Sequence, residues 1–532
     1  MKIRPVHGLL LVTFLVCVSA ALYLPWRDNP LVFDDLNLLK SMALMDFATT
    51  PFSFSTRQFP YFTLAFESVV SDGNLHVSRY VSLVLHGLNA SLLFLLAQRL
   101  LARALTPRRA FITALLLAIA FVVHPVAVYG VAYLIQRTVL LATFFLLLSA
   151  WQFEQSLTER SWRRAMIAGI CFGLAAMSKE HAITGFIAVL GIVLIDKTPD
   201  WHKVTLTVLA FLCVALPFAL WVLTIKLGYV GTVYEPDAQS MISAAGFPDA
   251  GSRLGNWLLS AELQCRFFFR YLGLWWWPDP AGMSIDIRPD FGSLSRFPLI
   301  LLGPAAFVAM AGGIAFTLTS KRVRPELKLT AFGLLWAMSL FLVELSTVRF
   351  QEAIVLYRSY LWSPGLLLAL AGLVSLIPAR TAATLATVAI LAMLPISWGR
   401  LDTFSDGLKL WQEAAVKLPQ ATTPGAIRIR FNLGLFQARA RQLDKAQGNF
   451  EWIKRQDPQS YLGYWGLSGI HIARGDQALA ADELNTVIRL KPDYGPAYFR
   501  QGMLLQKMGK DEESEAALNK AETLGMPHFE FK

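Results

Sequence analysis

Long apolar segments recur along the chain up to about residue 400. Each comes close to the ~20 residues that an α-helix needs to cross the hydrocarbon core of a bilayer. We expect eleven membrane spans, at residues 7–25, 77–98, 110–128, 138–156, 164–178, 182–196, 204–225, 297–319, 329–347, 361–378 and 381–398. The pattern predicts an all-α polytopic transmembrane domain over residues 1–400. The first span is expected to stay uncleaved, because Tyr23-Leu24-Pro25-Trp26 offers no small-residue cleavage site.

Basic residues mark every other connection between these spans. The basic connections contain Arg99, Arg103, Arg108 and Arg109; Arg160, Arg163 and Arg164; Lys197 and Lys203; Lys321, Arg322, Arg324 and Lys328; and Arg380. Short connections rich in Lys and Arg stay in the cytoplasm, so these connections and the N-terminus are expected there. An odd number of spans then places the C-terminal region in the periplasm, with the protein in a bacterial inner membrane.

The remaining connections are expected on the opposite side. They are residues 26–76, 124–137, 179–181, 227–296 and 349–360, and all of them carry charged side chains. The first contains Asp34 and Asp35 shortly after a span ends. There a carboxylate stays ionised at the water–lipid boundary and can still reach a lipid-borne substrate, although the same two acids could simply cap a helix. We predict an active site assembled from several of these loops.

Beyond residue 398 the sequence changes to a soluble helical pattern with a repeat of 34 residues. The positions in phase are Phe431, Trp465 and Phe499; Gly434, Ser468 and Gly502; and, at the expected turns, Arg441, Gly475 and Gly509. Large, small and turn residues at one period are typical of tetratricopeptide repeats. We predict a connecting helix at 401–424 and a tetratricopeptide α-solenoid domain at 425–532, with helical hairpins at 425–458, 459–492 and 493–526 and a concave partner-binding surface.

Composition excludes a soluble multidomain enzyme. Of the 532 residues, 55 % are hydrophobic and 16 % are charged, and the mean hydropathy is +0.47. The net charge of +11 is attributed to cytoplasmic loops and anion handling, and no nucleic-acid partner is predicted. Cys17, Cys171, Cys213 and Cys265 form no CxxC pair, so neither a disulfide framework nor a thiolate metal site is indicated. The sequence assigns no cofactor with certainty, and a divalent metal is possible but not indicated.

Several short motifs follow one another in a characteristic order. They are Asn29-Pro30-Leu31-Val32-Phe33-Asp34-Asp35 with Arg57; Leu83-Val84-Leu85-His86-Gly87-Leu88-Asn89; His124-Pro125; Gln136-Arg137; Met177-Ser178-Lys179-Glu180; Met283-Ser284-Ile285-Asp286; and Tyr357-Arg358-Ser359-Tyr360-Leu361. With these motifs and the repeats behind them, the chain resembles the multi-spanning glycosyltransferases of the C superfamily (GT-C). It is most similar to transmembrane and tetratricopeptide-repeat O-mannosyltransferase-like proteins and bacterial protein O-glycosyltransferases. One departure is Tyr357, where such proteins usually place an acid before the arginine.

The resemblance implies a sugar donor carried on a polyprenyl phosphate and transfer to an acceptor hydroxyl outside the cytoplasm, usually with inversion. One of Asp34 and Asp35 would act as the general base, and the other would orient the acceptor or the donor. Cations would neutralise the departing phosphate, and an arginine can bind two of its oxygens. The proposed phosphate contacts are Arg57, Arg137, Lys179 and Arg358, with Glu180, His124, Asp286 and Tyr360 in supporting roles. Each cation could instead snorkel to lipid head groups.

Other polar and aromatic residues favour structural roles. His86 and Asn89 fall inside a predicted span, where an interhelical hydrogen-bond pair is expected. His124-Pro125 is expected to shape a helix end, and Trp275-Trp276-Trp277 to form part of an interfacial aromatic belt.

The leading hypothesis is therefore an inner-membrane glycosyltransferase whose repeats recruit an acceptor protein, such as a pilin or another envelope protein. The alternative is a non-enzymatic, membrane-anchored tetratricopeptide scaffold for an envelope or pilus assembly, which would need only one or two spans. A transporter is disfavoured, because the charged residues gather on one face instead of at the membrane midplane.

Overall fold

The computed structural model describes residues 5–38, 43–50, 54–195, 201–233, 235, 238, 241–242, 252–291, 301–420 and 423–526. Tyr234, Pro236 and Asp237, and residues 297–300 of the predicted eighth span, lie outside these ranges. The chain divides into two compact units, Met1–Asp406 and Gly407–Lys532. Within the described ranges both units are helical, and the sole β pairing is an isolated bridge between Ile287 and Ile354. The all-α prediction is confirmed.

The helices of the first unit coincide with the predicted spans. They are α1 (Pro5–Tyr23), α5 (Leu75–Leu101), α6 (Pro107–Val123), α8 (Arg137–Glu159), α9 (Trp162–Ser178), α11 (Trp201–Lys226), α15 (Leu302–Thr319), α16 (Pro325–Leu345), α17 (Ser363–Val374) and α18 (Ala379–Thr403). The predicted span at 182–196 is a short helix, α10 (Gly185–Gly191), between the 3-10 turns η3 (Glu180–Thr184) and η4 (Ile192–Ile195).

Seven helices among the described residues are long and apolar enough to cross a membrane. They are Gly8–Trp26, Leu75–Leu101, Leu134–Glu159, Val204–Tyr229, Leu302–Thr319, Pro325–Leu345 and Ala379–Thr403. The protein is accordingly a multi-pass membrane protein, and the count of eleven spans stays a prediction. Two shorter apolar helices, Glu180–Ile195 and Ser363–Val374, fall below the crossing length.

The sequence determines where these helices begin and how closely they pack. The Asn74 side chain accepts a hydrogen bond from the His76 N–H at the start of α5 (3.0 Å), and Pro107 occupies the first turn of α6, where its missing N–H costs nothing. Helices α16 and α17 cross at Gly333 and Gly365. A Cβ atom on either glycine would collide with the backbone oxygen of the other, so only glycine allows this approach.

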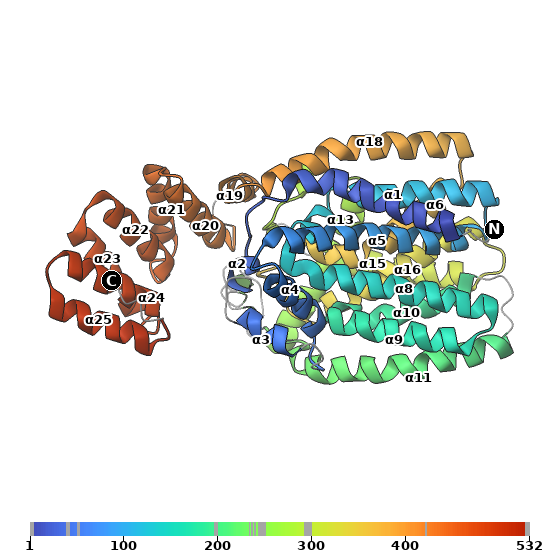
Figure 1. Cartoon of the computed structure of the whole chain (residues 1–532), viewed down its shortest axis with the longest axis horizontal. Coiled ribbons are helices and arrows are strands. Elements are labelled where there is room, and N and C mark those ends of the chain that lie inside the picture. The colour runs from blue at the N-terminus through green and yellow to red at the C-terminus, as the bar shows by residue number, and fades with distance from the viewer. Residues whose placement is uncertain are drawn as a thin grey trace. The chain divides into compact units, whose positions relative to one another are not determined.

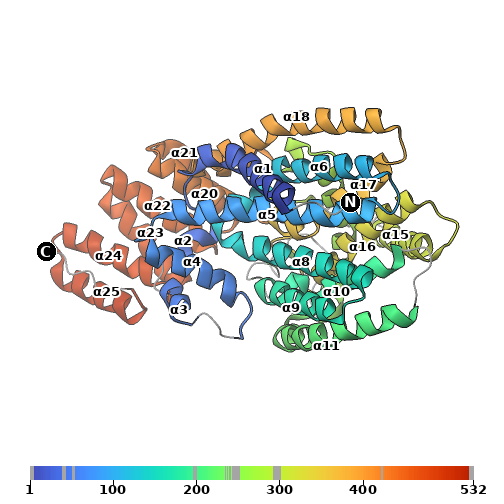
Figure 2. The same cartoon turned by 45° about the vertical axis from the view of Figure 1, so that its right-hand side comes forward.

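The connections of the first unit alternate between two ends of the helical bundle. Figures 1 and 2 show the N-terminus at one end and the short helices α2 (Asp34–Leu38), α3 (Ala43–Thr49) and α4 (Gln58–Val70) at the other. The described parts of the predicted cytoplasmic connections lie at the first end, where Arg99 and Arg103 pair with Glu154. We call the opposite end, which holds α2 to α4, the site end.

A long helix, α13 (Arg253–Trp276), lies in the fourth connection and was missed by the sequence analysis. Charged residues interrupt its apolar positions, so no span-like run appears in the sequence. Its buried face is aromatic: the ring of Phe268 lies 5.3 Å from that of Phe307 and 5.1 Å from that of Phe341. Helix α13 packs against α15, α16 and α17 and carries Trp275 to the site end.

The second unit contains the predicted hairpins. It comprises α19 (Gly407–Val416), α20 (Ala426–Arg439), α21 (Leu443–Gln456), α22 (Tyr461–Arg474), α23 (Gln477–Leu490), α24 (Gly495–Lys507) and α25 (Asp511–Thr523). The turn positions Arg441, Gly475 and Gly509 all have left-handed backbones, with φ of 62°, 87° and 74°. This conformation favours glycine, and its recurrence confirms the predicted turn register. The expected connecting helix is shorter than predicted, because α18 continues to Thr403 and α19 begins only at Gly407.

Candidate functional site

The Asp35 carboxylate is a buried structural anchor. Its side chain is 0 % exposed, and its two oxygens accept hydrogen bonds from the backbone N–H groups of Leu134 (3.2 Å) and Ile135 (2.8 Å). Burial raises the pKa of Asp35 to about 7, against the lowering effect of these hydrogen bonds. Asp35 thereby ties the first connection to the second and presents no oxygen to solvent.

Asp34, by contrast, is exposed. Its Oδ2 accepts a hydrogen bond from the Tyr133 hydroxyl (3.1 Å), and the Asp34 N–H donates to the same hydroxyl (3.1 Å). Burial raises the pKa of Tyr133, and the charge of Asp34 raises it further, so the phenol keeps its proton and acts as the donor. Asp34 is thus held at the site end with a carboxylate oxygen available to a substrate.

Tyr357 connects Asp34 with a group of buried charges. The rings of Tyr133 and Tyr357 meet edge to face with centroids 5.8 Å apart. Burial raises the pKa of Tyr357, and the charges of Arg358, Asp34 and Arg57 also act on its hydroxyl. The Tyr357 hydroxyl is therefore close enough to Asp34 and to the cations of the candidate site for their charges to act on it.

These charged side chains, buried or partly buried, come from four different connections or helix ends. They comprise Arg57, Lys179, Glu180, His181, Glu344, Arg349, Glu352 and Arg358, which we call the charge cluster. Arg57 pairs with Glu180, and Arg358 lies 3.2 Å from Glu344 and 2.7 Å from Glu352. His181 Nε2 is 3.0 Å from Glu344 Oε1. With histidine neutral, the Lys and Arg members outnumber the carboxylates by one.

Lys179 accounts for this surplus positive charge. The residue is 7 % exposed, and its ammonium group has no hydrogen bond or ion pair among the described residues. Burial lowers the pKa of Lys179 to about 7, and the neighbouring charge of Arg57 contributes to the lowering. A buried ammonium without a carboxylate partner is costly, which makes the cluster receptive to an anion.

Arg57 itself has a left-handed backbone with φ of 67°. Non-glycine residues rarely adopt this conformation, and it persists only where the surroundings enforce it. Here the Arg57 N–H donates to the Met177 carbonyl (2.7 Å), which fixes the guanidinium beside Glu180. Phe33, directly before Asp34, has φ of 47°, so Asp34 follows a strained position and Arg57 occupies one.

Arg137 lies apart from the charge cluster and is saturated. Arg137 is 1 % exposed, and its guanidinium pairs bidentately with Glu67 (2.7 and 3.1 Å). The remaining donors reach Ser82, Thr63 and the Ser78 carbonyl. The structure therefore leaves no free N–H on Arg137 for a phosphate, in contrast to its predicted role as a phosphate contact.

Tyr360 and His124 are also fully engaged. The Tyr360 hydroxyl lies 2.7 Å from His86 Nδ1 and accepts from Asn89 Nδ2 (3.2 Å), which is the interhelical network expected for His86 and Asn89. His124 follows the last residue of α6 and stacks on Trp275 at 4.1 Å between centroids. These residues shape helix contacts, and Trp275 belongs to the core instead of an aromatic belt.

Asp286 pairs with a neighbour in its own segment. Its carboxylate lies 2.7 Å from Arg288 Nε and accepts from Arg288 Nη2 at 2.9 Å. Arg288 also donates to the Gln351 carbonyl (2.8 Å), so the pair fastens the fourth connection to the fifth. The described ranges contain no group of three or more His, Cys, Asp or Glu side chains that could hold a metal ion.

Sequence reasoning missed Tyr133, Glu344, Arg349 and Glu352 as members of the site. Glu344 carried a usable signal, because a lone carboxylate at the end of an apolar span is a candidate functional residue. Tyr133 carried none, since its role depends on a contact with Asp34 across 99 positions of sequence.

Comparisons with known proteins agree with parts of this picture. Residues 58–223 match the family model described as dolichyl-phosphate-mannose-protein mannosyltransferase. The human protein "DnaJ homolog subfamily C member 3" is 34 % identical over 89 residues, which are 17 % of this chain and 18 % of that protein, and its bovine and murine counterparts match equally. The chain thus spans about a fifth of the length of these curated relatives.

One solved structure is similar over much of the chain. It is the crystal structure of ArnT from Cupriavidus metallidurans bound to undecaprenyl phosphate, with a TM-score of 0.36 and 15 % sequence identity. The similarity covers 91 % of this chain and 80 % of that one.

Proposed function

We propose that this protein is a GT-C-type membrane glycosyltransferase that transfers a sugar from a polyprenyl-phosphate donor to an acceptor hydroxyl. The observation that carries the proposal is the proximity of an exposed carboxylate, Asp34, to a partly buried charge cluster in which the Lys and Arg side chains outnumber the carboxylates by one. Tyr133 and Tyr357 join the two. The match of residues 58–223 to a family of lipid-phosphate-dependent mannosyltransferases supports the same chemistry. We place the reaction at the periplasmic face of a bacterial inner membrane.

Asp34 is the proposed general base. The acceptor oxygen attacks the anomeric carbon, the acceptor proton passes to Asp34, and the bond between the anomeric carbon and the phosphate oxygen breaks. The polyprenyl phosphate departs with the bonding electrons. We do not assign the base to Asp35, because both of its oxygens are buried and accept hydrogen bonds from backbone N–H groups. We assign it to holding the base in place.

The charge cluster is the proposed phosphate site. Negative charge grows on the leaving phosphate in the transition state, and fixed cations stabilise it there. Arg57, Lys179 and Arg358 are the proposed contacts, with Glu180 holding Arg57 in position. Arg137 is not included, because its donors are all used elsewhere. Through its ion pair with Glu67, Arg137 instead holds the start of α8 against α4.

The helical hairpins are the proposed recruiting element. Residues 425–532 would form tetratricopeptide repeats in the periplasm and bind an acceptor protein, such as a pilin or another envelope protein, for O-glycosylation. The predicted odd number of spans would put them on the same side of the membrane as Asp34.

A transfer assay tests the proposal. The purified full-length protein, reconstituted in nanodiscs, is expected to release free polyprenyl phosphate from a mannosyl or aminoarabinosyl polyprenyl phosphate when envelope protein is added. Release is measured by thin-layer chromatography of the radiolabelled lipid. No release with any lipid-linked sugar would contradict the proposal and favour the scaffold alternative.

Replacing Lys179 with Met is expected to weaken binding of polyprenyl phosphate about tenfold or more, because a charge-assisted contact is lost. Binding by the unmodified protein should also weaken as pH rises through 7, since the ammonium, whose pKa is about 7, then loses its charge. The Lys179→Met variant should lose this pH dependence. Both are measured by equilibrium binding of a fluorescent polyprenyl phosphate.

Lys226→Met is the matched control, because Lys226 lies at the end of α11 and its ammonium lies over the Tyr229 ring with no ion pair among the described residues. Its affinity for the lipid should equal that of the unmodified protein. Equal affinity in the Lys179→Met variant would remove Lys179 from the phosphate site.

A further inference from the structure

A pocket of about 420 Å³ opens on the repeat unit, bounded by α20, α21, α22 and α24. Three arginines line it: Arg439, Arg441 and Arg500. None of the described lining residues is Asp or Glu, and the remaining walls are largely apolar, including Leu435 and Ile470. The pocket thus combines positive charge with apolar surface.

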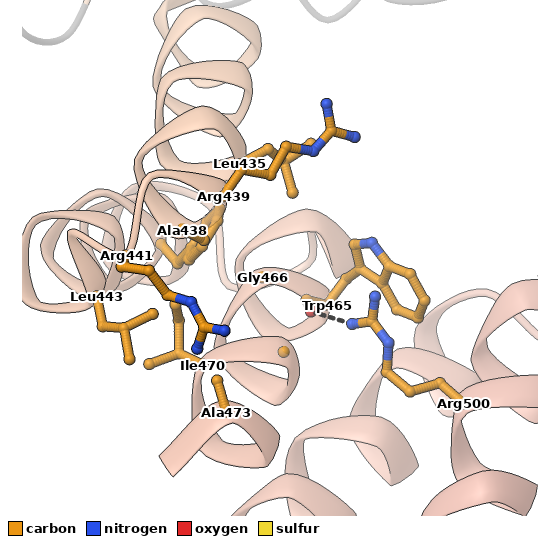
Figure 3. Close-up of a pocket in the computed structure, with 12 residues that line it drawn as sticks. Leu435, Ala438, Arg439, Arg441, Leu443, Trp465, Gly466, Ile470, Ala473 and Arg500 are labelled. Atoms are coloured by element: carbon orange, nitrogen blue, oxygen red, sulfur yellow. Dashed lines mark hydrogen bonds between the residues drawn. The ribbon is translucent and has the colours of Figure 1, made fainter. Parts of the chain in front are cut away.

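Two of the arginines converge on the pocket. Figure 3 shows the Arg441 and Arg500 side chains reaching into it from opposite sides, whereas Arg439 extends away from them. The Arg500 guanidinium lies 3.2 Å from the centroid of the Trp465 ring. Its Nη1 donates to the Trp465 carbonyl and to Ser468 Oγ, both at 2.9 Å. Arg500 is therefore locked in place.

These arginines lack the carboxylate partners that other cations of the same unit have. Lys454 pairs with Glu483 and Lys417 with Glu413, each at 2.7 Å. Within the described part of the chain, neither Arg441 nor Arg500 has an ion pair. Burial lowers the pKa of Arg500 to about 10, so the group stays charged at neutral pH. The pocket keeps an uncompensated positive potential that favours an anion.

The floor of the pocket is open at one glycine. A Cβ atom on Gly466 would collide with the Phe450 ring, so glycine is needed at this position for close packing. At Gly469 the nearest atom to an added Cβ is Arg500 Nη1, at 3.5 Å. An extended peptide backbone could approach the α22 surface there, between Arg441 and Arg500.

We infer that this pocket binds an acidic, partly apolar peptide segment of the acceptor protein. A carboxylate of the segment lies between Arg441 and Arg500, and an adjacent aliphatic side chain packs against Leu435 and Ile470. An anionic lipid head group fits less well, because it offers nothing to the apolar walls. The inference deepens the recruiting role and rests on the proposed function only in identifying the bound protein as the acceptor.

The test measures binding of a fluorescein-labelled, C-terminally amidated peptide of alternating Asp and Leu to the full-length protein in phosphatidylcholine nanodiscs. The Asp peptide should bind, and the matched Asn peptide should bind about tenfold more weakly or worse, because the charge-assisted contacts are lost. Arg441→Glu should reduce Asp-peptide affinity by at least the same factor. Gly469→Leu, which fills the floor, should weaken both peptides.

Arg489→Glu is the control, because Arg489 is exposed on α23 and does not line the pocket. It makes the same charge change and should leave affinity unaltered. Asp34→Asn should also bind the peptide normally, which separates this inference from the catalytic proposal. Equal affinity for the two peptides, unaltered affinity in Arg441→Glu, or displacement of the Asp peptide by phosphatidylglycerol vesicles would overturn it.

Discussion

Replacing Asp34 with Asn should reduce sugar transfer by about 10²–10⁴-fold, which is the usual cost of losing a general base. Asparagine keeps the size of the side chain and one acceptor for the Tyr133 hydroxyl, but it cannot take the acceptor proton. The protein should therefore fold and bind polyprenyl phosphate normally while turnover nearly vanishes. The measurement is transfer from purified lipid-linked sugar at matched protein levels.

Asp35→Asn is the matched control, because the substitution is identical and the position is adjacent. Its carboxylate accepts from the Leu134 and Ile135 N–H groups, and asparagine retains one of these two acceptors. We expect a loss of thermal stability and a transfer rate within about tenfold of normal, since one lost hydrogen bond costs ~1 kcal/mol. Near-normal transfer in Asp34→Asn would refute the base assignment. A severe loss confined to Asp35→Asn would transfer the role to that residue.

Replacing Arg137 with Met should destabilise the protein by ~3–5 kcal/mol, because it leaves the buried Glu67 carboxylate without its partner. The two side chains are 0 % and 10 % exposed. Adding Glu67→Leu to Arg137→Met should recover much of the loss, since no buried charge then remains. The measurement is the midpoint of thermal unfolding in detergent, followed by labelling of the buried thiols of Cys171 and Cys265.

The exposed pair between Arg164 and Glu159 provides the comparison. The Arg164 and Glu159 side chains are 32 % and 48 % exposed, and their charged groups are 2.7 Å apart. Arg164→Met should therefore change the free energy of unfolding by no more than ~1 kcal/mol. An unfolding midpoint in Arg137→Met that matches the unmodified protein, combined with weaker lipid binding, would return Arg137 to the phosphate site.

The sequence predicted that the loops converge but not which role each of their charged residues has. Alternating basic connections placed residues 26–76, 124–137, 179–181 and 349–360 on one side, and contacts such as Asp35 with Ile135 and Arg57 with Glu180 confirm that they meet. Adjacent acids look alike in sequence, however. Only the three-dimensional contacts show that Asp35 faces backbone N–H groups and that Asp34 faces outward.

Partners distant in sequence explain the remaining differences. Arg137 was predicted as a phosphate ligand because nothing in the sequence links it to Glu67, which lies 70 positions earlier. Helix α13 was missed because its apolar residues follow a helical period instead of a continuous run. The hairpin turns at Arg441, Gly475 and Gly509 were predictable, because the signal there is local and repeats three times.

The carboxylates of the charge cluster are expected to affect how the proposed enzyme releases its lipid product. Polyprenyl phosphate without its sugar carries more negative charge than the donor did, so four unopposed cations would hold the spent lipid most firmly. Glu180, Glu344 and Glu352 already neutralise most of that charge. When the lipid leaves, the cations can therefore pair again with these neighbouring carboxylates. For the proposed enzyme we therefore expect a site with fewer acids to bind the spent lipid more tightly and to release it more slowly.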